Sequence, residues 1–173
     1  MDESVGPTTR WLSEHELHGW RTFVQAHERL INRLDDALTA HTSLTLAEYE
    51  VMVHLSESPE WRKRMNELAE ECNLSPSGLT RRFDSMVRSG LVERARCDAD
   101  RRGVFAVLTA KGYELLVRAA PTHVDSVRRY FLDLLEPGEL DLITAVFQRV
   151  GTEPTPERVM HAPLMRVPAG AQR

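Results

Sequence analysis

Arginines are concentrated in one stretch of this 173-residue chain. Between Ser75 and Val104, seven arginines stand against four acidic residues, so the stretch has a formal charge of +3 in a chain whose total is −4. The planar guanidinium group binds phosphate and guanine edges through paired hydrogen bonds. A basic stretch in an otherwise acidic protein therefore indicates a local site for a polyanion rather than a binding surface spread over the whole molecule.

The first of these arginines are expected on a helix that starts at Ser75. Serine is a favoured N-cap residue, Pro76 suits the first turn, and Gly90 suits the end of the helix. One face is apolar, because hydrophobic residues recur at helical spacing: Leu79, Phe83, Met86 and Val87. The opposite face combines small, hydroxyl and charged side chains: Ser77, Gly78, Arg81, Asp84, Ser85 and Arg88. Such a helix buries one face and presents arginines on the other.

A charged hairpin is predicted directly after this helix. Residues 91–96 and 104–108 have the length and composition of two short strands, and the loop between them runs from Cys97 to Gly103. The loop contains Arg101 and Arg102, and Asp100 is predicted to hold one of these arginines through a bidentate ion pair.

A further short helix is predicted over residues 65–72, with Asn73 ending it in the left-handed conformation. Two short helices joined by a tight turn form a helix-turn-helix, and a basic hairpin behind them makes a winged helix. The major groove of DNA admits one helix, and a basic loop reaches phosphates or the minor groove. We therefore predict that ten residues contact double-stranded DNA: Ser75, Ser77, Gly78, Arg81, Arg82, Ser85, Arg88, Arg94, Arg101 and Arg102.

A long amphipathic helix is predicted before this unit. Ser13 and Glu16 have the spacing of a capping box, and the helix is expected to run from residue 14 to about 40. Its apolar stripe continues for about six turns, which is typical of helices that pack against other long helices, often across a dimer. The stripe contains Leu17, Trp20, Val24, His27, Ile31, Leu34 and Leu38.

The remaining elements complete a mainly α-helical fold with a small β-hairpin wing. Thr45 and Glu48 form a second capping box, and a polar turn over residues 60–64 separates the helix they open from the helix-turn-helix. A helix capped by Thr109 is expected to reach about Leu135, and Pro137-Gly138-Glu139 is expected to begin a last helix that runs through Val150. We divide the chain into a flexible N-terminus (1–12), an N-terminal dimerisation helix (13–44), a winged helix-turn-helix lobe (45–109), C-terminal dimerisation helices (110–150) and a proline-containing tail (151–173).

Several short motifs in this lobe have a familiar arrangement. They are Asp98-Ala99-Asp100-Arg101-Arg102, followed by Val107-Leu108-Thr109 and Gly112, and the helix–hairpin junction Ser89-Gly90-Leu91-Val92. The stretch 46–112 that contains them resembles the multiple-antibiotic-resistance regulator (MarR) family. The long flanking helices match the dimerisation region of that family, so the resemblance covers about residues 12–150.

The resemblance implies a homodimer in which each protomer inserts its recognition helix (75–88) into a major groove and its wing (94–105) into the adjacent minor groove. Two-fold symmetry then implies a pseudo-palindromic operator with half-site centres about 10 bp apart. Members of the family usually repress genes near their own, and many release DNA when a small phenolic or carboxylate ligand binds. We therefore predict a sequence-specific transcription regulator, a repressor released by an aromatic or carboxylate ligand. The alternative is an architectural DNA-binding protein without a ligand.

The effector pocket of this family lies where the dimerisation helices meet the DNA-binding lobe. The candidate ligand-binding residues are accordingly Trp20, His27, Glu50, His54 and Arg62. Glu50 and His54 are four residues apart and share a helix face. Trp20, Glu50 and Arg81 also partly resemble the ligand residues of a urate-responsive branch of the family, in which an aspartate usually stands at the position of Glu50. Alternatively, Trp20 and His27 belong to a dimer core, and Glu50 and His54 form a surface pair.

The cysteines and histidines allow further interpretations. Cys97 lies at the base of the wing beside Arg96, which would lower its pKa and make the regulator thiol-responsive; a tolerated surface cysteine is the alternative. Cys72 falls on the apolar face of a short helix and is expected to be an inert core residue. His15 and His18 are three residues apart, but two histidines do not complete a metal site, so we expect no metal.

Other classes of protein fit this sequence less well. It has no nucleophile elbow, phosphate-binding loop or paired-cysteine motif, so we predict neither an enzyme nor a cofactor. No apolar stretch approaches the ~18 residues of a membrane span, the N-terminus does not read as a signal peptide, and two cysteines suit a reducing compartment. We therefore expect a cytoplasmic protein without membrane contact. A winged helix used for protein contacts would present an apolar or acidic face in place of the arginines.

Overall fold

The computed structural model describes residues 9–96 and 104–150. Its helices are α1 (Glu14–Thr42), α2 (Leu46–Ser56), α3 (Met65–Glu71), α4 (Pro76–Arg88), α5 (Ala110–Tyr130) and α6 (Glu139–Val150). Its strands are β1 (Arg62–Arg64), β2 (Val92–Arg96) and β3 (Val104–Leu108), and short 3-10 turns cover Pro59–Trp61 and Leu132–Leu134. This mainly helical fold with a small sheet confirms the predicted fold class.

The two predicted capping boxes are present at the starts of α1 and α2. The Ser13 hydroxyl accepts a hydrogen bond from the backbone N–H of Glu16 at 3.2 Å, and the Glu16 carboxylate accepts one from the backbone N–H of Ser13 at 2.8 Å. Thr45 and Glu48 form the same reciprocal pair, at 3.2 and 3.0 Å. Each box satisfies backbone donors that the first turn of a helix leaves unpaired, which explains why the sequence predicts both starts correctly.

The sheet contains a strand that the sequence analysis missed. β3 lies in the centre, with β2 antiparallel on one side and β1 antiparallel on the other. β1 covers residues 62–64, inside the segment for which a polar turn is predicted. That prediction is wrong because three successive charged residues show no hydrophobic alternation. The strand forms through backbone pairing, with Lys63 opposite Ala106.

α5 ends earlier than the predicted Leu135. The helix continues through Pro121 but stops at Tyr130, because Phe131 has φ −140° and ψ −69°, outside the helical region. The leucine-rich residues that follow form a 3-10 turn, although their spacing is also compatible with a helix. After this break the chain reverses direction toward α6. Pro137 also disfavours helical geometry at the preceding residue, Glu136. α6 then starts at Glu139, the last residue of the predicted start Pro137-Gly138-Glu139.

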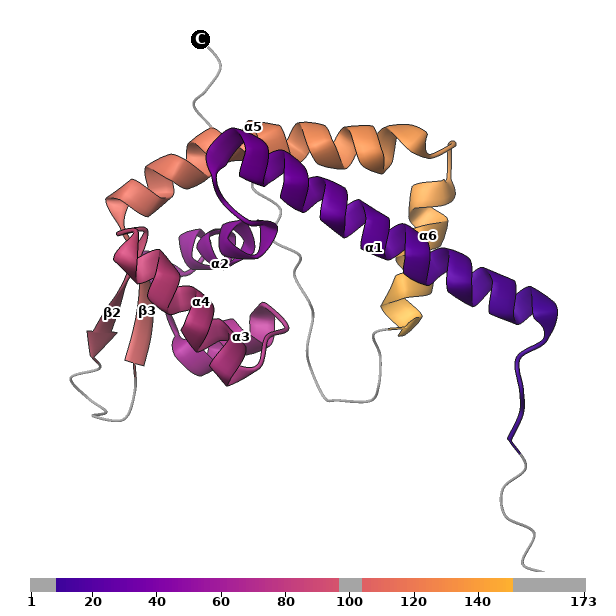
Figure 1. Ribbon diagram of the computed structural model, residues 1–173, viewed down its shortest axis with the longest axis horizontal. Helices are drawn as coiled ribbons and strands as arrows, with labels where there is room; N and C mark the ends of the chain where they lie inside the picture. Colours follow the sequence, from indigo (N-terminus) through magenta and orange to yellow (C-terminus); the bar gives the residue numbers. More distant parts are fainter. Residues whose placement is uncertain (1–8, 97–103, 151–173) are drawn as a thin grey trace, which may run out of the picture.

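One hydrophobic core lies between the helices and the sheet. It takes fully buried side chains from α1 to α5 in turn: Leu38, Met52, Leu68, Phe83 and Leu116. Gly112 lets α5 approach the sheet, because a Cβ atom there would lie 2.1 Å from the backbone oxygen of Leu91. Figure 1 shows α1 and α5 side by side above α2, with α3, α4 and the strands β2 and β3 below them.

The first two thirds of α1 and the whole of α6 lie outside this core. Leu34 and Leu38 are the buried residues of α1, and α6 has none. Figure 1 shows α6 folding back beside α1, where the rings of Phe147 and Phe23 are 5.5 Å apart. Among the described residues, no helix is both long and apolar enough to cross a membrane.

Candidate nucleic-acid interface

The arginine-bearing face of α4 is built by its N-cap and its apolar face. The Ser75 hydroxyl accepts a hydrogen bond from the backbone N–H of Gly78 at 3.1 Å and fixes the first turn. Leu79, Phe83 and Met86 are buried, so the helix cannot rotate without exposing them. The predicted apolar face is therefore confirmed, and it fixes the direction in which the arginines point.

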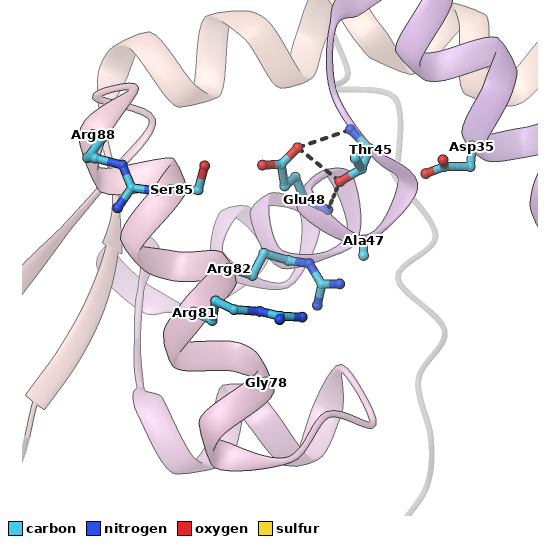
Figure 2. A pocket seen from close by; sticks show the side chains of 9 residues that line it. All are labelled: Asp35, Thr45, Ala47, Glu48, Gly78, Arg81, Arg82, Ser85 and Arg88. Atoms are coloured by element: carbon cyan, nitrogen blue, oxygen red, sulfur yellow. Dashed lines mark hydrogen bonds between the residues drawn. The ribbon is translucent and has the colours of Figure 1, made fainter.

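An open pocket of about 530 Å³ lies between this face and the start of α2. Five of the residues predicted to contact DNA form one wall: Gly78, Arg81, Arg82, Ser85 and Arg88. The other wall comes from the end of α1 and the first turn of α2: Asp35, Thr45, Ala47 and Glu48. Figure 2 shows Arg81 and Arg82 extending from α4 toward the start of α2. The arginine-bearing face of α4 thus also borders an open groove.

The two acidic residues of the pocket are engaged by backbone groups. A carboxylate oxygen of Asp35 accepts a hydrogen bond from the backbone N–H of Leu46 at 2.7 Å. The Glu48 carboxylate is held in the capping box, where it also accepts a bond from the Thr45 hydroxyl at 2.9 Å (Figure 2). Both acids therefore stabilise the start of α2 instead of neutralising the arginines across the pocket.

Three arginines on α4 keep their charge available. Within residues 9–96 and 104–150, Arg81, Arg82 and Arg88 form no salt bridge. Arg81 and Arg88 are exposed and Arg82 is half-buried. Unpaired guanidinium groups on one helix face form a local positive field, which attracts phosphate or carboxylate groups.

Arg94 has a different environment from these three. Its Nη1 atom lies 2.7 Å from Oδ1 of Asp84, and its guanidinium group stacks over the buried ring of Phe83 at 5.2 Å. Arg94 is one of the ten residues predicted to contact DNA, and Asp84 is the partner that binds it within the protein. Asp84 is the acidic residue on an otherwise basic face, and this was the signal that an arginine nearby is bound within the protein.

The wing loop falls outside the described residues. Arg101 and Arg102, the partner proposed for them (Asp100) and the candidate thiol Cys97 all lie between residues 97 and 103. Their assignments to DNA, to an ion pair and to thiol regulation stay predictions.

The five candidate ligand residues are not brought together in one site. None of them lines the pocket of Figure 2. Trp20 is 58% exposed on α1, and Phe23 lies 6.0 Å from it and 6.3 Å from His27, measured between ring centroids. These two candidates thus belong to an aromatic row on the outer face of α1.

The other three candidates lie in or near the lobe. Glu50 is exposed on α2, yet partial desolvation by the surrounding protein raises the pKa of its carboxyl, and the charge of Arg82 opposes this rise. His54 faces Glu71 on α3 instead of Glu50. Arg62 lies in β1, where it contacts Glu60 at 3.1 Å and stacks on Phe105, so its predicted place in a turn is wrong.

Cys72 has the environment of an unreactive thiol. It is half-buried at the end of α3, and burial, helped by the negative charges of Glu50 and Glu71, raises its pKa to about 12. At neutral pH the thiol stays protonated and is a poor nucleophile. In the part of the chain that the structure describes, no three His, Cys, Asp or Glu side chains form a group able to hold a metal ion.

The helix-turn-helix of α3 and α4 together with the three-stranded sheet defines a winged helix. A family model described as MarR family matches residues 42–103 of this chain. AbsC, a MarR family transcriptional regulator from Streptomyces coelicolor, is 41% identical, with 82% of this chain and 95% of that chain covered and a TM-score of 0.78. The structure of Sco3205, a MarR family transcriptional regulator from the same organism in complex with DNA, is 35% identical, with 91% and 100% covered and a TM-score of 0.82.

Curated relatives match over a shorter length. The transcriptional regulator PecS of Dickeya dadantii is 27% identical over 109 residues, which are 62% of this chain and 63% of PecS. The chain thus spans less than two thirds of that relative. The two Streptomyces structures match at higher identity over nearly their full lengths. The chain therefore belongs to the MarR family of transcriptional regulators.

Proposed function

We propose that this protein is a homodimeric, sequence-specific DNA-binding repressor that inserts α4 into the major groove. The observation that carries the proposal is a set of arginines that form no salt bridge within residues 9–96 and 104–150, on a helix whose opposite face is buried in the core. In this orientation Arg81 reaches base edges or phosphates, and the small residues Ser77 and Gly78 let the helix approach the DNA closely. Sco3205, which is 35% identical, is described in complex with DNA.

Dimerisation is supported by the apolar surface that α1 and α6 leave uncovered. Trp20, Phe23 and Leu142 are 58%, 41% and 65% exposed, and Phe147 is 46% exposed. A monomeric soluble protein rarely exposes so many large apolar side chains on adjacent helices. A second copy of the same face would bury them in an isologous contact. Two α4 helices related by this two-fold axis would read half-sites about 10 bp apart.

Release by a small anionic ligand is supported by the pocket between α4 and α2. A carboxylate or phenolate bound there would pair with Arg81 and Arg82, which are the groups proposed to bind DNA. Ligand and DNA would then compete for the same charges, so that ligand binding relieves repression. The volume of about 530 Å³ suits a molecule with one or two aromatic rings.

A fluorescence anisotropy titration tests the proposal. The purified protein is titrated against the DNA upstream of its own gene at two salt concentrations, with a scrambled duplex as control, and aromatic acids are then added. We expect tight, salt-dependent, sequence-selective binding that one class of aromatic acid reverses. Binding no tighter than to scrambled DNA would favour the architectural alternative, and tight binding that no acid reverses would remove the ligand from the proposal.

A further inference from the structure

Glu71, the last residue of α3, connects three elements of the lobe through one carboxylate. The Lys63 ammonium group on β1 donates hydrogen bonds to both carboxylate oxygens, at 2.6 Å to Oε1 and 2.5 Å to Oε2. Nδ1 of His54, in the last turn of α2, lies 3.3 Å from Oε2. Glu71 therefore contacts the sheet on one side and α2 on the other.

Lys63 links this carboxylate to the wing. β1 pairs with β3 along its length, with Lys63 opposite Ala106, and β3 pairs with β2. β2 and β3 are the two strands that carry the wing loop. Because β1 is tied to β3 by backbone hydrogen bonds, the bond from Lys63 to Glu71 adds a polar contact between the sheet and α3 beside their buried core contacts. α3 in turn packs against α4, which bears Arg81, Arg82 and Arg88.

The Lys63–Glu71 pair is only partly shielded from water. The side chains of Lys63 and His54 are 19% and 12% exposed, whereas that of Glu71 is 41% exposed, so water competes for the carboxylate but little for its two partners. Desolvation lowers the pKa of His54; Glu71 opposes this shift, and Lys63 adds to it. The lowered pKa favours the neutral form of His54, and Lys63 is the cation that is hydrogen-bonded to Glu71. The other charged or titratable groups of this region are Glu50, Cys72 and Arg82.

We propose that Glu71 is a positioning residue for DNA binding: it fixes the wing sheet relative to the recognition helix through Lys63. The inference rests on the proposed function, because it assumes that α4 and the wing bind the same DNA molecule. Two DNA-binding elements must be held at a fixed separation if they are to enter neighbouring grooves together. Without the bond, the sheet can shift slightly relative to α3, and restoring its position costs part of the binding free energy. Glu71 itself touches no DNA in this scheme.

A double-mutant cycle tests this role. Glu71→Ala is combined with the wing variant Arg101→Ala/Arg102→Ala, and affinity is measured by anisotropy on the duplex that binds most tightly in the titration above. We expect Glu71→Ala alone to weaken binding about fivefold, and to weaken it less than about twofold in the wing variant, because the wing contact is already lost. The salt dependence should also fall toward that of the wing variant.

Matched variants separate positioning from loss of structure. Glu67→Ala removes an exposed carboxylate from the same helix and should leave the affinity unchanged. Glu71→Gln keeps an acceptor for Lys63 and should recover at least half of the lost binding free energy. Lys63→Met removes the cation while keeping its aliphatic length and should reproduce the loss, so it carries the test if Glu71→Ala does not fold. Urea unfolding of each variant reports its folding.

Two results would overturn the inference in different ways. If Glu71→Ala weakens binding equally with and without the wing arginines, and leaves the salt dependence unchanged, Glu71 acts on the lobe as a whole and not through the wing. If the wing variant alone binds DNA as tightly as the unmodified protein, the predicted contact of Arg101 and Arg102 with DNA is wrong and the role of Glu71 is lost with it, whereas the proposed insertion of α4 into the major groove stands.

Discussion

The DNA-binding lobe and the long helices bury their apolar residues very differently. In the lobe, Phe83 and Met86 of α4 and Met52 of α2 are completely buried within one protomer. On α1, Trp20 is 58% exposed, although it belongs to an equally regular apolar stripe. Helical periodicity is therefore the same in both regions, but the lobe covers its own stripes and the long helices do not.

The lobe is stabilised by burial within one chain, whereas the long helices are stabilised by association with another surface. The lobe has helices on one side of its core and a sheet closing it, so its folding free energy is a property of the single chain. The first two thirds of α1 and the whole of α6 gain little from burial within the chain. Their apolar side chains stabilise the protein only when another surface covers them. If that surface is a second copy of the chain, the stabilisation depends on protein concentration.

Truncating a lobe core residue should produce the largest effect. Phe83→Ala removes a fully buried ring that also supports the guanidinium group of Arg94. We expect the free energy of unfolding to fall by about 3–5 kcal/mol, measured by urea denaturation. Phe147→Ala, on α6, is the matched control, and its effect should shrink as the protein is diluted. An effect of Phe83→Ala that depends on concentration would contradict the division between the two regions.

Disrupting the exposed face of α1 should change assembly rather than folding. Phe23 contacts Trp20, His27 and Phe147, and it is 41% exposed. Phe23→Asp would place a charge in the proposed dimer contact, and we expect the dimer to weaken by about 2 kcal/mol or more. Sedimentation equilibrium measures this change. Glu28→Gln on the same helix is the control and should dimerise normally. If Phe23→Asp remains a full dimer, α1 does not form the interface.

The sequence predicts most of the fold because local signals coincide with the final structure. Two capping boxes, the Ser75-Pro76 start and the left-handed Asn73 and Gly90 are all present where predicted. β1 was not predicted, because it forms by long-range backbone pairing with β3 and its own side chains show no alternating pattern. The end of α5 escaped it because the leucines after Tyr130 are compatible with either a helix or a turn.

The site is less predictable than the fold, because it depends on pairing between side chains of different elements. Helical spacing locates Arg81 and Arg88 on the free face of α4, but it does not show that Arg94 is held by Asp84. Spacing also pairs Glu50 with His54 on one helix face, whereas His54 contacts Glu71 of α3. Such partners are chosen by the packing of helices that are far apart in the sequence.

Arg81 should contribute to DNA affinity, and Arg94 should contribute to the stability of the lobe. Arg81→Ala should weaken specific DNA binding by about 1–3 kcal/mol and relax the preference at one base position, if it reads a base edge. Urea unfolding should hardly change, because Arg81 is exposed and forms no salt bridge within the described residues. Arg94→Ala is the comparison, and it should lower the stability of the lobe because it leaves Asp84 without its partner. Affinity lost equally on all sequences would make Arg81 a phosphate contact.

The smallest expected effect lies where the two regions meet, at His123 of α5. Its ring packs 4.6 Å from that of Tyr49 on α2, and its Nδ1 atom is buried without a hydrogen-bond partner among the described residues. His123→Phe preserves the ring contact and removes the unpaired atom, so we expect a gain of about 1 kcal/mol in unfolding free energy at neutral pH.

The pH dependence of stability gives the His123 variant a second, independent signature. Burial lowers the pKa of His123 below its usual 6.5, so the unfolded chain takes up a proton at a higher pH than the folded protein does. The contribution of neutral His123 to the free energy of unfolding is fully present above pH 6.5. It is lost as the pH falls through 6.5 toward the pKa of the folded state. His123→Phe should therefore lose less stability than the unmodified protein between about pH 7.5 and about pH 5.5, in urea unfolding at each pH. Replacement of the exposed His15 by Phe is the control for introducing a phenyl ring. A destabilised His123→Phe variant that keeps the full acid sensitivity would contradict this prediction. The ring nitrogen would then have a hydrogen-bond partner in solution, and the junction between α5 and the lobe would contain no unpaired polar atom at this position.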